Sequence, residues 1–227
     1  MITIKNFPLR ERNKARTRLS IIDAFLVRLE NKNFDDITID EICDDVQISK
    51  GTFFNYFPRK IDMILYNALL WNLEAMWLTT KRPGASPGLP SIDYIFAWFA
   101  ETIKKHPLFF LELIALRSRK PEEINKLDEP GSRRVSSAER VLRFPELQEI
   151  TSIKAGNYSH ILRIQLEAAI KKEELPDNID IEAVILSLGI ILYGVPLMLI
   201  NQNPEKLAKT YLYHLNLFWA GLKTAVQ

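Results

Sequence analysis

The chain has one cysteine and little glycine in its 227 residues. The single cysteine, Cys43, excludes a disulfide within the chain and fits a reducing compartment. The 8 glycines and 12 prolines leave long stretches rich in Leu, Ile, Ala, Glu and Lys, which predicts an all-α protein. Hydrophobic residues make up 47%, which is enough for a sizeable core and argues against disorder. No apolar signal-peptide segment follows Met1, so we expect a cytoplasmic protein.

Motifs of the common enzyme classes are also missing. The three histidines, His106, His160 and His214, are far apart and lack metal-ligand spacing. The sequence contains no HExxH, GxSxG, GxGxxG or P-loop motif. Cys43 lies on the apolar side of a predicted helix, where a core residue is expected and not a nucleophile. The sequence therefore predicts no catalytic site, no metal site and no cofactor.

One uncharged segment raises the question of a membrane. Residues 184–200 hold no charged side chain, but a spanning helix needs about 20 apolar residues. The segment also contains Ser187, Gly189, Gly194 and Pro196. A buried core helix is the better interpretation, and no membrane partner is expected.

Charge is balanced overall, at +2, but not along the chain. The first 20 residues hold a single acid, Glu11, and six bases, namely Lys5, Arg10, Arg12, Lys14, Arg16 and Arg18. This excess is typical either of a phosphate-facing arm or of a solvated terminus.

Apolar periodicity and breaking residues divide the chain into helices. On the first helix Ala15, Leu19, Ile22, Leu26 and Leu29 repeat with a helical period and should form its buried face. Residues 81–90, with three prolines and two glycines, predict the clearest loop. The predicted helices cover about 9–31, 38–46, 49–56, 59–80, 91–105, 107–118, 121–128, 145–174, 180–201 and 204–225.

The segment from 38 to 57 predicts a helix-turn-helix. Thr38 and Glu41 form a capping-box pattern, Gln47 and Ile48 make a tight turn, and Ser49 can cap the next helix. Ile42, Val46, Ile48 and Phe53 can pack the two helices together. The outward positions of the second are polar or aromatic, at Ser49, Lys50, Thr52, Asn55 and Tyr56. In a helix-turn-helix this second helix enters the major groove of DNA.

The run from Thr38 to Lys60 resembles the DNA-binding domain of the TetR/AcrR family of transcriptional regulators, and the resemblance covers residues 10–75. The chain departs from the family pattern at three points. Cys43 replaces a usual Ala, and Gln47 replaces the turn Gly, where a positive φ costs about 1 kcal/mol. Phe54 replaces the usual Tyr.

The resemblance implies a DNA-binding regulator, with a repressor released from a pseudo-palindromic operator by a small molecule as the first expectation. It implies a helix-turn-helix domain at 1–60 and a helical regulatory and dimerisation domain at 61–227. Arg16 and Arg18 should add phosphate attraction. The implied DNA contacts are Thr38, Gln47, Ser49, Lys50, Gly51, Thr52, Asn55, Tyr56 and Lys60. A helical protein-interaction module without specific DNA binding is the alternative.

Two further sites are predicted in the second domain. A small apolar or aromatic ligand should lie among Trp71, Trp77, Tyr94, Trp98, Phe109 and Phe110, unless these residues are ordinary core. A homodimer should form through the helices at 145–174 and 204–225, with Ile161, Gln165, Tyr211, Leu215 and Phe218 at the interface. The alternative is that this apolar stripe packs inside the monomer.

Overall fold

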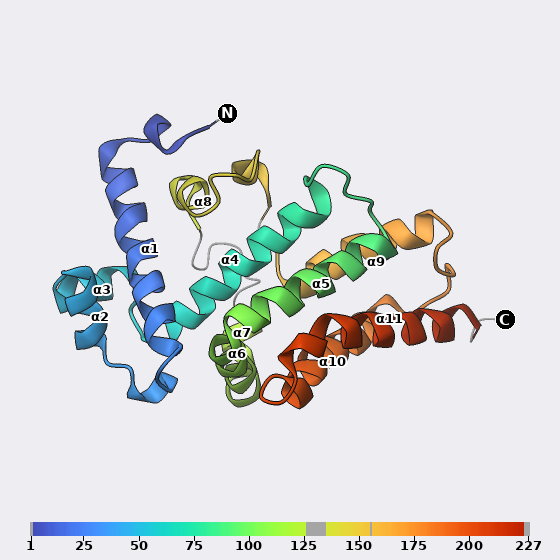
Figure 1. The fold of residues 1–227 in the computed structure, drawn as a ribbon. Helices are drawn as coiled ribbons and strands as arrows, with labels where there is room; N and C mark the ends of the chain where they lie inside the picture. The colour runs from blue at the N-terminus through green and yellow to red at the C-terminus, as the bar shows by residue number, and fades with distance from the viewer. Residues whose placement is uncertain (1, 126–134, 155, 225–227) are drawn as a thin grey trace. The chain divides into compact units, whose positions relative to one another are not determined.

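The computed structural model describes residues 2–125, 135–154 and 156–224, and every regular element in these ranges is helical. Figure 1 shows the ribbon. The α-helices are α1 (Leu9–Leu29), α2 (Ile39–Val46), α3 (Lys50–Tyr56), α4 (Ile61–Thr80), α5 (Leu89–Lys105), α6 (Pro107–Arg119), α7 (Pro121–Asn125), α8 (Ser137–Arg143), α9 (Tyr158–Lys171), α10 (Ile181–Leu199) and α11 (Leu207–Thr224). In the described residues the 3-10 turns are η1 (Ile4–Asn6), η2 (Phe34–Asp36), η4 (Ile150–Ser152) and η5 (Pro204–Lys206). The predicted all-α class is confirmed.

The chain folds as two compact units that do not follow the predicted boundary at residue 60. Unit 1 comprises residues 1–74 and 108–155, and unit 2 comprises residues 75–107 and 156–227. Helix α4 belongs to both, because its first fourteen residues, 61–74, lie in unit 1 and the rest in unit 2.

In unit 1, α1 presents the predicted apolar face to the core. Ala15, Leu19, Ile22, Leu26 and Leu29 are all buried, as their spacing predicts. Helix α1 packs against both α2 and α8. The unit 1 part of α4 is buried along most of its length, which explains why its sequence is apolar on most sides.

Unit 2 is a helical bundle in which α11 packs against α5 and α10, and α9 packs against α5 and α10. Asp180 caps α10 as predicted, since its carboxylate accepts hydrogen bonds from the backbone N–H groups of Glu182 at 3.0 Å and Ala183 at 3.1 Å. By length and composition α10 could cross a membrane. The prediction of a buried core helix holds for one side only, because 33% of its most apolar window is buried. Its buried side, which includes Val184, Leu188 and Leu192, faces the unit's core.

The predicted helix at 145–174 is wrong. Helix α8 ends before Phe144, the turn η4 follows, and α9 begins only at Tyr158. The break has a local cause, because the Asn157 side chain accepts a hydrogen bond from the His160 N–H at 2.7 Å and so starts a new helix. Helix α8 itself is capped by Ser136 and Glu139, a capping box that the sequence contains. The predicted ends of the helices at 121–128 and 204–225 lie outside the described residues.

Unit 1 contains a buried amide side chain without hydrogen-bond partners. Asn67 on α4 is completely buried, and neither its amide oxygen nor its amide nitrogen has a hydrogen-bond partner in the described structure. Burying an amide without partners destabilises a fold. Asn67 therefore weakens the core of unit 1.

We predict that Asn67→Leu stabilises the protein. The substitution replaces an unpaired amide with an apolar group of similar volume, and should raise the free energy of unfolding by about 1 kcal/mol or more. Urea denaturation measures the change. Asn13→Leu, at an exposed position on α1, is the control and should stay within about 0.5 kcal/mol of wild type. An Asn67→Leu protein that is less stable than wild type would contradict this interpretation.

Candidate DNA-binding site

The predicted capping box positions the start of α2. The Thr38 hydroxyl accepts a hydrogen bond from the Glu41 N–H at 3.2 Å, and the Glu41 carboxylate accepts one from the Thr38 N–H at 2.9 Å. Ile42 and Cys43 are buried, while Ile39 and Val46 are half-buried. The Thr38 side chain is thus already engaged within the protein, although the residue stays exposed.

The turn between α2 and α3 has the left-handed backbone that the sequence predicts. Gln47 adopts φ 55° and ψ 51°. Its N–H and that of Ile48 donate hydrogen bonds to the carbonyls of Asp44 at 3.3 Å and Cys43 at 3.0 Å. Gln in this conformation costs about 1 kcal/mol relative to a right-handed one. This turn leaves the Gln47 side chain exposed just before α3.

Helix α3 is short, capped and polar on its outer face. Ser49 caps it by accepting a hydrogen bond from the Thr52 N–H at 3.1 Å. Lys50, Gly51 and Asn55 are exposed, whereas Thr52 and Tyr56 are half-buried. A side chain at Gly51 would meet nothing closer than the Ser49 hydroxyl at 3.7 Å, so folding alone does not require glycine there. A close approach by another molecule would require it.

Phe54 also lies on the outer face of α3, and the sequence interpretation did not assign it a role. It is 44% exposed, and its ring packs edge-on against buried Phe53 at 5.5 Å. The helical spacing from Lys50 to Phe54 was the signal that could have placed it on this face. The ring adds an apolar patch between Lys50 and Asn55.

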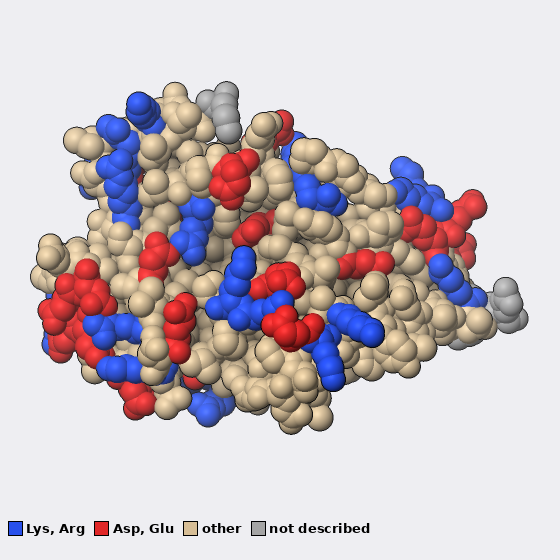
Figure 2. All heavy atoms as spheres, viewed as in Figure 1, with Lys and Arg blue, Asp and Glu red and all other residues tan. Residues whose placement is uncertain are grey.

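The acidic face of α2 is largely neutralised by ion pairs. Arg28 on α1 lies 3.0 Å from Glu41 and 2.6 Å from Asp45, and Lys32 lies 2.5 Å from Glu41. The hydrogen bonds from Lys32 and from the Thr38 N–H lower the pKa of Glu41 to about 2. Figure 2 shows acidic residues gathered over α2 and α3 and basic residues over the start of α1.

Lys50 is paired as well. Its amino group lies 2.7 Å from the Asp40 carboxylate on α2, and this hydrogen bond raises the pKa of Lys50. Both side chains are more than half exposed, so the pair is open to solvent and weak. Lys50 can therefore exchange Asp40 for another anion.

Lys60 and Arg18 are placed differently from what the sequence suggests. The Lys60 amino group donates hydrogen bonds to the carbonyls of Phe34 and Asp35 and lies over the Phe34 ring at 4.3 Å. Burial lowers the pKa of Lys60. Arg18 turns inward and lies 4.0 Å from the centre of the Tyr66 ring. Arg16, by contrast, is exposed on α1.

The residues predicted for the ligand pocket are divided between the two units. Trp71 and Phe109 stack edge-on at 4.7 Å in unit 1, where Phe110 is also buried. Trp77, Tyr94 and Trp98 belong to unit 2, and Tyr94 is 38% exposed. Two hollows of the described structure are lined by other residues. The first is lined by residues 56–59 and 62 with Arg18 and Glu123, and the second by residues 170, 171 and 173–177 with Lys223.

The predicted dimer residues are mostly internal. Ile161, Gln165, Tyr211 and Leu215 are buried in unit 2. Four of the five thus pack inside the monomer, and only Phe218 is half-buried. The assignment failed because the α11 stripe that includes Tyr211 and Leu215 faces α5 and α10.

Comparison with known proteins identifies the fold. Neither the family models nor the curated sequences match the chain. Among solved structures, Salmonella enterica GusR matches with a TM-score of 0.60 at 18% identity, over 92% of this chain and 95% of that one. Thermus thermophilus FadR, a TetR-family repressor in complex with lauroyl-CoA, matches with a TM-score of 0.56 at 19% identity, over 88% and 92%.

A third match is a TetR-family regulator from Cytophaga hutchinsonii, with a TM-score of 0.57 at 13% identity over 93% of this chain and 97% of that one. The chain has the fold of the TetR-family transcriptional regulators. The resemblance inferred from residues 38–60 is confirmed at this level. Within the TetR fold, α2 and α3 form the helix-turn-helix.

We predict a pH-dependent role for Glu41. Its pKa is about 2 in the folded protein against an ordinary 4.5. A lowered pKa stabilises the fold above pH 4.5, and this contribution is lost as the pH falls toward 2. Glu41→Gln keeps the cap but not the charge, so it should melt earlier than wild type at pH 7, and the difference should close in acid.

Circular dichroism melts from pH 7 to pH 2 measure the difference. Glu30→Gln, at an exposed position near the same cluster, serves as control and should melt like wild type throughout. If the difference in melting temperature between Glu41→Gln and wild type does not change with pH, the charge of Glu41 is not involved.

Proposed function

We propose that the chain is a DNA-binding transcriptional regulator that reads the major groove with α3. The observation that carries the proposal is the geometry of α3, a short helix capped by Ser49 after a left-handed turn, with Lys50, Gly51 and Asn55 exposed. Helices of this kind contact base edges through their N-terminal residues. The TetR fold supports the same function.

The proposed contacts divide into two groups. Asn55 is placed to read a base edge, adenine being the usual partner of Asn, and Gln47 reaches the DNA from the turn. Lys50 and the N-terminal backbone of α3 bind phosphate, helped by the helix dipole and the absent side chain at Gly51. Thr38, Ser49, Thr52, Tyr56 and Lys60 are proposed to contact or position the DNA backbone, with Lys60 acting through the turn at 34–36.

We predict that three variants change the affinity for duplex DNA from upstream of the chain's own gene, two by weakening binding and one by tightening it. Fluorescence anisotropy measures the affinity. Lys50→Ala should weaken binding to all sequences and lower the slope of log K against log salt by about 1. Asn55→Ala should cost about 1 to 3 kcal/mol and relax preference at one base position. Asp40→Asn should tighten binding, because it frees Lys50.

Lys105→Ala, an exposed lysine on α5, is the matched control and should bind like wild type. Wild-type affinity in Lys50→Ala and Asn55→Ala would reject α3 as the reading helix. If wild type binds no duplex at all, the alternative of a helical protein-interaction module is favoured.

The regulator is proposed to act as a homodimer. One reading helix contacts too few bases for specific binding, whereas two half-sites about 34 to 36 Å apart, or a multiple, allow it. Helices α10 and α11 expose an apolar face made of Leu186, Ile190, Leu197, Met198, Leu212, Tyr213 and Leu217. A face of this kind suits a second copy of the chain, packed as a four-helix interface.

We predict that Ile190→Asp combined with Leu217→Asp yields a monomer. Both side chains are more than half exposed, so the fold should survive, while a buried charge would oppose association. Light scattering at micromolar protein should give about twice 26.3 kDa for wild type and 26.3 kDa for the variant. Val27→Asp on α1, 61% exposed, is the control. A monomeric wild type would reject the constitutive dimer.

Ligand control is the last part of the proposal. We propose that a small apolar or aromatic ligand releases the regulator from a pseudo-palindromic operator, and that the chain is a cytoplasmic repressor and not an enzyme. The lauroyl-CoA in Thermus thermophilus FadR supports an apolar ligand. The ring contact between Trp71 and Phe109 at 4.7 Å supports these two residues as candidate contacts for such a ligand.

A further inference from the structure

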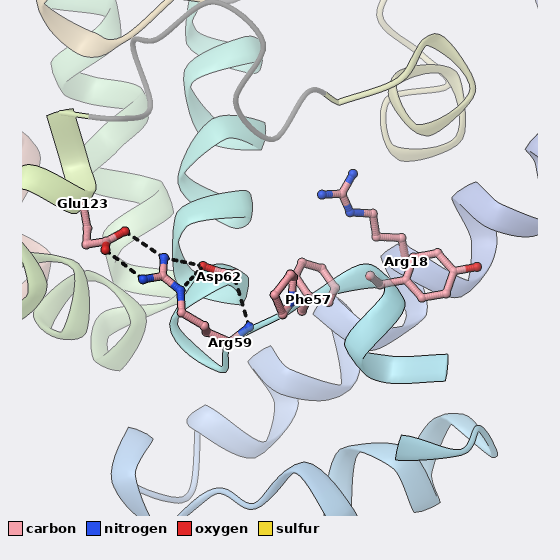
Figure 3. Close-up of a pocket in the computed structure, with 7 residues that line it drawn as sticks. Arg18, Phe57, Arg59, Asp62 and Glu123 are labelled. Atoms are coloured by element: carbon pink, nitrogen blue, oxygen red, sulfur yellow. Dashed lines mark hydrogen bonds and ion pairs between the residues drawn. The ribbon is translucent and has the colours of Figure 1, made fainter. Parts of the chain in front are cut away.

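Arg59 joins the end of the reading helix to two other segments of unit 1. It lies three residues beyond the end of α3, and its guanidinium donates paired hydrogen bonds to both oxygens of Glu123 on α7, each at 2.8 Å. The same guanidinium donates a hydrogen bond to the Asp62 carboxylate at the start of α4 at 2.9 Å. The backbone N–H of Arg59 donates another to that carboxylate at 3.0 Å. Figure 3 shows Arg59 pointing between the two carboxylates.

A second arginine makes a similar connection from α1. Arg18 lies over the rings of Tyr66 at 4.0 Å and Phe57 at 5.4 Å, and 3.3 Å from the Glu139 carboxylate on α8. The other oxygen of Glu139 accepts the Ser136 N–H at 2.6 Å. Glu139 is therefore fixed in place on α8 and holds Arg18 beside Phe57, the C-cap residue that follows α3.

Both glutamates are buried, Glu123 with 6% and Glu139 with 2% of its surface exposed. A buried carboxylate is strongly unfavourable without a partner, and each of these two has an arginine within ion-pair distance. A third pair between the same segments, Arg143 with Asp23, joins more exposed side chains and should contribute little.

Packing does not surround the end of α3 completely, although Phe57 is buried against Phe53 and Tyr66. A hollow of about 360 Å³ lies there, lined by Arg18, Tyr56, Phe57, Pro58, Arg59, Asp62 and Glu123. Protein interiors are otherwise close-packed, and a hollow leaves room for a side-chain shift. Two ion pairs, which we call the clamp, act at this end of α3. Arg59–Glu123 joins the segment after α3 to α7, and Arg18–Glu139 joins α1 to α8 beside Phe57.

We infer that Glu123 and Glu139 are positioning residues for operator recognition, because the clamp fixes the direction in which α3 leaves the core of unit 1. The inference rests on the proposed function. A dimer with fixed reading helices accepts one distance between half-sites. Inserting one base pair moves the second half-site by about 3.4 Å and turns it by about 35°. Without the clamp, α3 can adjust and the preference for one distance is lost.

The test measures spacing preference in the full-length protein. Affinity is measured for wild type, for the double variant Glu123→Gln with Glu139→Gln, and for the control Glu122→Gln. Each is tested with an upstream duplex and with derivatives that have one or two base pairs inserted or removed at the centre. Glu122 is the exposed neighbour of Glu123 on α7. Wild type and Glu122→Gln should lose about tenfold or more in affinity when the spacing changes. The double variant should lose less than about threefold, since it can still engage both half-sites.

A purely structural defect would weaken binding to all spacings alike, so the ratio between spacings reports positioning. The inference is overturned if the double variant folds and its ratio of affinities between spacings equals that of wild type. If the double variant does not fold, Arg59→Lys decides by the same ratio, because it keeps a cation but cannot form the paired hydrogen bonds. A wild type that binds none of the duplexes overturns the proposed function itself, which is distinct from failure of the clamp alone.

Discussion

Two buried glutamates in unit 1 need positive partners, and the chain supplies both from the helix-turn-helix region. Arg59 follows the reading helix directly, and it bonds Glu123 on α7 and Asp62 on α4 at once. Arg18 on α1 reaches Glu139 on α8 across the Tyr66 ring. Because a buried charge is unfavourable without its partner, these pairs couple the helix-turn-helix to α7 and α8. This coupling also explains why unit 1 joins residues 1–74 to residues 108–155.

The reading surface depends on charge neutralisation close to it. Helix α2 carries four acids, Asp40, Glu41, Asp44 and Asp45, that would repel phosphate if left unpaired. Arg28 and Lys32 neutralise Glu41 and Asp45 from α1 and the following turn, while Asp40 pairs with Lys50 on the reading helix. The exchange of Asp40 for a phosphate at Lys50 then involves only solvent-exposed groups. The acidic helix thus sits beside α3 without closing its surface to DNA.

Local signals in the sequence predicted local structure. The caps at Thr38, Ser49 and Asp180, the buried face of α1 and the left-handed turn at Gln47 depend on residues a few positions apart, and all were predicted. The capping box at Ser136 and Glu139 was also visible but was overlooked, so α8 was missed. The pairs Arg59–Glu123 and Arg18–Glu139 join residues 64 and 121 positions apart and leave no periodic pattern. The contacts of Lys60 could not be predicted for the same reason, since its partners lie at residues 34 and 35.

The central claim is that two identical reading helices, each held at a fixed angle, recognise two half-sites of one operator. Repeated selection of bound duplexes from a random-sequence pool, followed by sequencing, tests it most directly. The account predicts enrichment of an inverted repeat whose half-sites keep one separation, about 34 to 36 Å between centres or a multiple of that distance. No enrichment, or half-sites recovered at many separations with equal frequency, would contradict it.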